Sequence, residues 1–123
     1  MNLNNPSYKQ DLVIVQNWYN YIKYSTKVLG LIPNKIKYNV TDWVIKINLN
    51  VIGLLMDVKY SQFSNKKIEK LHEILIEIEK IKFMYNFLYE EKYISLNQFN
   101  TISDFLLNTS KMGNGWIKYV TKK

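Results

Sequence analysis

The feature that most constrains the fold of this chain is the shortage of helix-breaking residues between long stretches of helical periodicity. Gly occurs four times and Pro twice in 123 residues, so turns are few and the secondary-structure elements must be long. Between the breaks, apolar residues recur every three or four positions, which is the period of an amphipathic α-helix. We therefore predict four helices, over residues 7–28, 34–60, 66–92 and 96–119.

The breaks between these helices carry end signals. Gly30 can end the first helix by adopting a left-handed conformation, and Pro33 suits the first turn of the second. Asn65 is the expected N-cap of the third helix, and Ser95 with Gln98 forms a capping box for the fourth. Connections of a few residues make consecutive helices antiparallel. We predict a single-domain, all-α, up-down-up-down four-helix bundle.

The predicted buried stripes differ in width. In the first helix the stripe comprises Leu12, Val15, Tyr19, Ile22 and Thr26, with Trp18 beside it. In the second helix the main stripe comprises Ile36, Val40, Trp43, Ile47, Val51, Leu54 and Val58. A further stripe there comprises Val44, Leu49, Ile52, Leu55 and Met56. The stripe of the fourth helix comprises Phe99, Ile102, Leu106, Thr109, Trp116 and Val120. The excess apolar surface of the second helix predicts contact with another copy of the chain, although a central helix in a tight bundle would also explain it.

Composition excludes several kinds of site. The chain has no Cys, which removes disulfides, thiolate zinc sites and cysteine nucleophiles. The one histidine, His72, follows Glu69 in the Glu-x-x-His pattern of di-iron bundles, but such sites need two of these motifs and further inward carboxylates. No nucleophile turn or phosphate-cradling glycine loop is present. We expect neither enzymatic activity nor a metal or cofactor.

The sequence also contains no membrane signal. Its longest apolar run, from Val51 to Met56, is far shorter than the roughly 20 residues that span a bilayer. The first residues lack the charged start and apolar stretch of a signal peptide. We expect a cytoplasmic protein without a membrane partner.

Charge is unevenly distributed along the chain. The formal net charge is +7, and because there is no Arg all 17 cations are Lys. Residues 1–67 carry +6, residues 68–93 carry −2 and residues 94–123 carry +3. This asymmetry favours a polyanionic partner, of which nucleic acid is the commonest. Lysine recognises phosphate as a point charge, so we expect binding without sequence specificity.

The predicted phosphate-binding residues form two sets. The first comprises Lys23, Lys27, Lys35, Lys37 and Lys46, and the second Lys111, Lys118, Lys122 and Lys123. Lys and Tyr are also sequence neighbours six times, for example at Lys37 and Tyr38. A tyrosine ring beside an ammonium group suits single-stranded nucleic acid, although a tyrosine at a helix end can equally cover the core.

Several segments resemble a known family. They are LLMDVKYS at residues 54–61, EKYISLNQF at residues 91–99 and KMGNGWIK at residues 111–118, together with Pro33 followed by Lys35, Lys37 and Tyr38. In these motifs, over about residues 15–121, the chain resembles the four-helix-bundle proteins typified by the accessory variability determinant of diversity-generating retroelements. The same superfamily includes proteins encoded by intervening sequences in large-subunit ribosomal RNA genes.

The resemblance implies a homopentameric barrel of bundles with a basic surface. Such a barrel would bind a reverse transcriptase and its template RNA or cDNA, and would support mutagenic reverse transcription without catalysing a reaction. The alternative is a stand-alone structural or interaction bundle of the intervening-sequence type, which oligomerises but has no polymerase partner. The sequence does not separate the two.

Overall fold

The four predicted helical regions are helical in the structure, a computed structural model that describes residues 6–122, with side chains from Val13 onward. Its elements are α1 (Pro6–Gly30), α2 (Asn34–Ile36), the π-helical turn η1 (Lys37–Thr41), α3 (Asp42–Tyr60), α4 (Ser64–Glu90) and α5 (Leu96–Thr121). The described residues form four long helices and no strand, which confirms the predicted all-α class.

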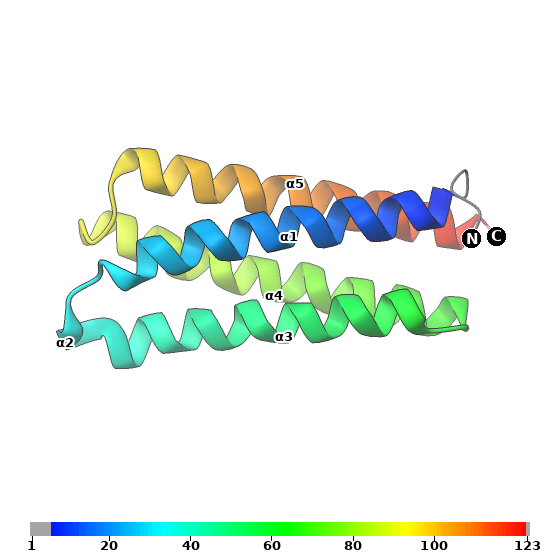
Figure 1. Cartoon of the computed structure of the whole chain (residues 1–123), viewed down its shortest axis with the longest axis horizontal. Helices are drawn as coiled ribbons and strands as arrows, with labels where there is room; N and C mark the ends of the chain where they lie inside the picture. Colours follow the sequence, from blue (N-terminus) through cyan, green and yellow to red (C-terminus); the bar gives the residue numbers. More distant parts are fainter. Residues whose placement is uncertain (1–5, 123) are drawn as a thin grey trace.

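The four long helices lie side by side along the long axis of the molecule (Figure 1). Helix α4 packs against both α3 and α5, and α1 packs against α5 more extensively than against α3. Helices α3 and α5 have no extensive contact, so they occupy opposite corners of the bundle. The α1–α3 and α4–α5 connections lie at one end of the molecule, which we call the α1–α3 end, and the α3–α4 connection lies at the other.

The predicted helix over residues 34–60 is divided by η1. A π-helical turn holds more residues than an α-helical turn, so it rotates the side chains before it relative to those after it. Thr41, the last residue of η1, is buried, and its Oγ1 has no hydrogen-bond partner among the described residues. The division was not predicted, because the apolar spacing continues through it.

At the α1–α3 end of the molecule, local hydrogen bonds cap the start of α5 and the end of α4. Ser95 Oγ accepts a hydrogen bond from the Gln98 amide at 3.1 Å, and Gln98 Oε1 accepts one from the Ser95 amide at 2.8 Å. The predicted capping box is therefore confirmed. After α4, Lys92 has a positive φ of 65°, and the amide of Tyr93 donates to the carbonyl of Leu88 at 2.8 Å. This is the Schellman ending, with lysine in the position that glycine usually takes.

Two predicted end signals were wrong. Gly30 is the last residue of α1 rather than a left-handed residue after it, and none of the described glycines has a positive φ. Asn65 lies inside α4, which begins at Ser64, and its Oδ1 accepts a hydrogen bond from the Lys66 amide.

Buried side chains from all four long helices form one hydrophobic cluster. On α5 the predicted stripe is buried at Ile102, Leu106, Thr109, Trp116 and Val120, which confirms most of it. Gly113 is also buried there, and a Cβ at this position would lie 3.3 Å from Leu75 Cδ2. The missing side chain therefore allows α4 and α5 to approach closely.

The predicted stripe of α1 was wrong in its rotation, although Trp18 beside it is buried, and Leu12 lies outside the residues whose side chains are described. Tyr19 and Thr26 are exposed and Val15 and Ile22 are half-buried. The buried positions are instead Ile14, Trp18, Tyr21, Ser25, Val28 and Leu29. On α3, the predicted stripe is buried except at Trp43, which is partly exposed, while Val44 and Leu55 from the second stripe are buried. The physical reason for the difference on α1 is that Tyr21 and Ser25 form hydrogen bonds with Asn48 and Tyr85 inside the core, so their side of the helix faces inward.

Candidate nucleic-acid interface

The first predicted set of lysines lies at the α1–α3 end. Lys23 and Lys27 are one helical turn apart on the exposed side of α1, and Lys35 is exposed on α2. Lys37 is half-buried on η1, and Lys46 is exposed on the first turns of α3. We call these five residues the end lysines. An α-helix rises by about 1.5 Å per residue, so each of them lies within about 10 Å of the end of α1 or the start of α3.

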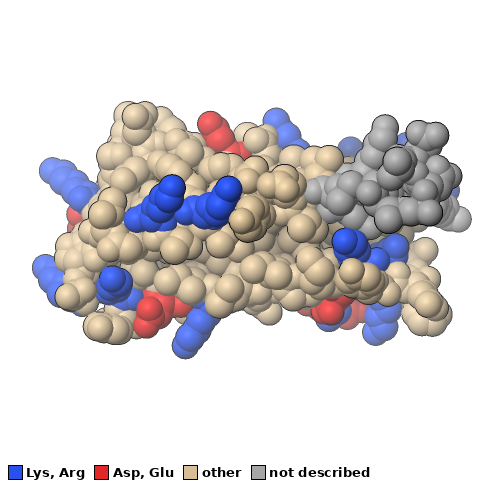
Figure 2. Space-filling model, viewed as in Figure 1, with Lys and Arg blue, Asp and Glu red and all other residues tan. Residues whose placement is uncertain are grey.

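The end lysines carry uncompensated charge. The ion pairs between described residues all lie within α4, at Lys66–Glu69, Lys70–Glu73, Lys80–Glu77 and Lys82–Glu79. None of the end lysines takes part in such a pair, and Asp42 is the single acidic residue between positions 23 and 46. In Figure 2, lysine side chains stand on both halves of the visible face, including the half that holds the α1–α3 connection, and the acidic side chains lie near the edges of the face. Glu90 and Glu91, where α4 stops, also lie at this end, but together with Asp42 they are outnumbered by the end lysines and Lys92. This end of the molecule therefore attracts anions.

Aromatic rings accompany these ammonium groups. Tyr38, next to Lys37, is 77% exposed. The Lys23 Nζ lies 4.8 Å from the ring centroid of Tyr19, which is also exposed. An exposed ring beside a lysine can stack on an unpaired base while the ammonium group contacts the neighbouring phosphate.

The other predicted Lys–Tyr neighbours mostly do not present a free ring. Tyr24, Tyr93 and Tyr119 are half-buried, and Tyr8 lies outside the residues whose side chains are described. Of the six neighbours, only Tyr38 and Tyr60 are exposed among the described side chains. The three half-buried tyrosines therefore cover the core, as the alternative interpretation of the Lys–Tyr pattern expects.

The second predicted set lies on a different surface. Lys111, Lys118 and Lys122 are exposed at positions i, i+7 and i+11, so they follow one face of the α5 helix and its end. Lys111 is 15 residues after the start of α5, about 22 Å along the axis from the α1–α3 end. Because α3 and α5 occupy opposite corners, these residues, which we call the α5 lysines, cannot share one contact surface with Lys46. Lys123 lies outside the described residues.

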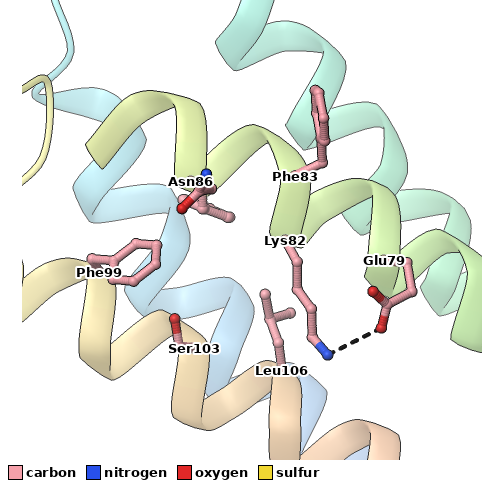
Figure 3. Close-up of a pocket in the computed structure, with 8 residues that line it drawn as sticks. Glu79, Lys82, Phe83, Asn86, Phe99, Ser103 and Leu106 are labelled. Carbon is pink, nitrogen blue, oxygen red and sulfur yellow. Dashed lines mark hydrogen bonds and ion pairs between the residues drawn. The ribbon is translucent and has the colours of Figure 1, made fainter. Parts of the chain in front are cut away.

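A groove between α4 and α5 is a further candidate site, because it contains a lysine (Figure 3). It is lined by Glu79, Lys82, Phe83, Tyr85, Asn86, Phe99, Ser103 and Leu106. Lys82 Nζ lies 3.1 Å from Glu79 Oε1, and Asn86 Nδ2 donates to Glu90 Oε1 at 3.0 Å. The positive charge of Lys82 is thus already compensated, which makes the groove a poor anion site compared with the α1–α3 end.

A buried polar network joins three helices, and it was not predicted from the sequence. Tyr21 OH donates to Asn48 Oδ1 at 2.8 Å, Asn48 Nδ2 donates to Ser25 Oγ at 3.2 Å, and Ser25 Oγ shares a hydrogen bond with Tyr85 OH. Trp18 Nε1 donates to the Asn48 carbonyl at 3.1 Å. Burial raises the pKa of Tyr21 well above 10 and raises that of Tyr85, so both phenols stay neutral. The network fixes α1, α3 and α4 relative to one another.

The signal for this network was present but ambiguous. Ser25 stands four residues after Tyr21, and Asn48 stands between Val44 and Val51, where an apolar residue would be expected on a buried face. Most buried polar side chains have a hydrogen-bond partner, and for an amide as large as that of asparagine such a partner usually lies on another helix. The sequence alone does not say which helices meet.

The described residues contain no group of three or more His, Asp or Glu side chains placed to hold a metal ion. His72 and Glu69 are both exposed on α4. Within the same residues, none of the helices combines the length and the hydropathy needed to cross a bilayer.

No protein-family model matches the chain, and no curated protein matches it significantly.

Proposed function

We propose that this protein is a non-catalytic, nucleic-acid-binding subunit that assists the reverse transcriptase of a diversity-generating retroelement. The observation that carries the nucleic-acid part is the group of five end lysines, which have no ion-pair partner among the described residues, together with the exposed ring of Tyr38 next to Lys37. The polymerase part follows from the family resemblance of residues 54–61, 91–99 and 111–118, and of Pro33 with the lysines that follow it. The end lysines would contact phosphates, and the α5 lysines would make a second, weaker contact.

The proposal includes the finer architecture. The three connections of a few residues, at alternating ends of the molecule in Figure 1, support an up-down-up-down order of the four long helices. The partly or largely exposed Trp43, Ile45 and Leu49 on α3 support contact with another copy of the chain. The resemblance gives five copies as the expected number.

The salt dependence of binding tests the nucleic-acid part. If all five end lysines contact phosphates of duplex DNA, the slope of log affinity against log salt concentration should be about −4.5, because each contact contributes about −0.9. Affinity should then fall about 500-fold between 50 and 200 mM salt. The measurement is fluorescence anisotropy with a labelled duplex, repeated with a structured RNA. Binding that is absent, or equally strong at both salt concentrations, contradicts the proposal.

A stand-alone bundle of the intervening-sequence type is the second candidate. It is favoured by the exposed apolar side chains on α3 and α4, which suit protein contacts better than phosphate contacts. The gene neighbourhood separates the two candidates: an adjacent reverse-transcriptase gene with a near-repeat pair supports the first, and a surrounding ribosomal RNA gene supports the second. Co-purification of the chain with that reverse transcriptase would then establish the partner directly.

A further inference from the structure

Helix α1 carries a row of polar side chains that continues beyond the end lysines. The row consists of Gln16, Asn20, Lys23 and Lys27, at positions i, i+4, i+7 and i+11, so it follows one face of the helix. Its character changes along the helix, from two lysines near the α1–α3 end to two amides near the middle. Asn20 is three residues before Lys23, which is about 4.5 Å along the helix axis. Uncharged hydrogen-bonding groups therefore stand directly beside the lysines of α1.

The two amides line an open hollow between α1 and α5, which lie side by side (Figure 1). The hollow measures about 560 Å³. It is lined by Val13, Gln16, Asn17, Asn20 and Met112, which we call the amide hollow. None of these residues is charged, and Asp104, the one acidic residue among the described side chains of α1 and α5, does not line it. The amide hollow therefore neither repels a nucleic acid nor holds its phosphates.

The amide groups of the hollow are held in place and keep hydrogen-bonding capacity. Gln16 Nε2 donates to Asn20 Oδ1 at 3.1 Å. Gln16 Oε1 and Asn20 Nδ2 have no hydrogen-bond partner among the described residues. Asn17 Nδ2 donates to the Phe105 carbonyl at 3.3 Å and to Thr109 Oγ1, which ties this side chain to α5. The hollow thus presents a free acceptor and a free donor on neighbouring side chains.

We propose that the amide hollow binds an unpaired base of a strand whose phosphates contact Lys23 and Lys27. Base edges carry hydrogen-bond donors and acceptors without charge, and amide side chains are among their usual partners. The short distance along α1 allows a phosphate on Lys23 and a base in the hollow to belong to neighbouring nucleotides. The inference rests on the proposed nucleic-acid binding and adds the class of substrate, which is single-stranded.

The apolar part of the amide hollow suits the face of a base. Val13 is 50% exposed and Met112 is half-buried, so both offer apolar surface that a base can cover. A methionine sulfur also makes favourable contacts with aromatic rings. Because the hollow is recessed between two helices, a base in a duplex would have to leave its stack and lose its pairing partner to enter. An unpaired base avoids this cost, which favours a single strand as the substrate.

A pair of strands with and without bases tests the amide hollow. One is a labelled nine-nucleotide oligothymidine, and the other is the same strand with abasic residues throughout, which keeps the phosphates. In the full-length chain, Gln16→Ala with Asn20→Ala removes both amides and changes no charge. Fluorescence anisotropy at low salt should show that this variant binds oligothymidine about tenfold more weakly than the wild type, because two hydrogen bonds are lost. It should bind the abasic strand as tightly as the wild type, with an unchanged salt dependence on both strands.

The matched control is Gln62→Ala with Asn65→Ala, which removes the same two kinds of side chain from exposed positions at the α3–α4 connection. It should bind both strands like the wild type. Alanine favours the helix at positions 16 and 20, so the helical content of the test variant should be unchanged by circular dichroism.

Two results overturn the inference: an equal loss of affinity for both strands, or no loss for oligothymidine. If the wild type still binds both strands in a salt-dependent manner, the proposed function survives such a result, because the phosphate contacts are intact. If the wild type binds neither strand, the amide hollow and the proposed function both fail.

Discussion

Replacement of Asn48 with leucine is expected to lower the free energy of unfolding by about 3 kcal/mol. Leucine has nearly the shape of asparagine but removes the acceptor for Tyr21 OH and the donor to Ser25 Oγ, both inside the core. The cost is large because each hydroxyl loses a hydrogen bond that water cannot replace at a fully buried position. Urea unfolding followed by circular dichroism measures the change as a lower midpoint with an unchanged slope.

The matched control for this variant is Asn50→Leu, two residues away on the exposed side of α3. Asn50 also donates a hydrogen bond, to Glu77 Oε2 at 3.0 Å, but both groups can bond to water. This variant should change stability by less than about 0.5 kcal/mol. In a double-mutant cycle, Asn48→Leu and Tyr21→Phe should cost less together than the sum of the two, because they remove the same hydrogen bond. Equal costs for Asn48→Leu and Asn50→Leu would show that the network does not stabilise the bundle.

Reversal of charge at Lys35 and Lys37 is expected to weaken nucleic-acid binding about 100-fold at low salt. Each Lys→Glu change removes one phosphate contact and adds a repulsive charge at the α1–α3 end, where only Asp42 is acidic between residues 23 and 46. The slope of log affinity against log salt concentration should become shallower by about 2. Lys35 is exposed and Lys37 is half-buried, and neither forms an ion pair with another described residue, so the variant should keep its helical content.

The control for this reversal is Lys118→Glu with Lys122→Glu, which changes net charge by the same amount on the α5 lysines. If binding depended on net charge alone, both double variants would lose affinity equally. If the end lysines form the interface, the control should lose less than about tenfold. Unchanged affinity in Lys35→Glu with Lys37→Glu would exclude the region before α3 from the interface.

The elements of this fold that could be predicted from sequence are those set by local signals. The capping box at Ser95 and Gln98 needs only residues within one turn, and it is present as expected. The α5 stripe follows from simple periodicity, because α5 has one clear apolar face that includes Ile102, Leu106 and Trp116. The shortage of glycine and proline, together with apolar residues at every third or fourth position, sufficed for the all-α class.

The elements that could not be predicted depend on partners distant in sequence. Tyr19 and Tyr21 are equally suitable for a buried stripe until Asn48 and Tyr85 are known to meet Tyr21 in the core. The same limitation applies to the lysines, because charge identifies the basic segments but not which of them meet. The structure places the end lysines near one end of the molecule, on α1, α2, η1 and α3, and the α5 lysines along another surface.

The most direct test of the nucleic-acid proposal is chemical-shift mapping of backbone amides in isotope-labelled protein during titration with a short single-stranded RNA at low salt. We predict that the largest shifts occur between residues 23 and 46, around the end lysines and Tyr38, and that they disappear when salt is added. Shifts concentrated on residues 111–122, or the absence of shifts at an RNA concentration that saturates binding, would contradict an interface at the α1–α3 end.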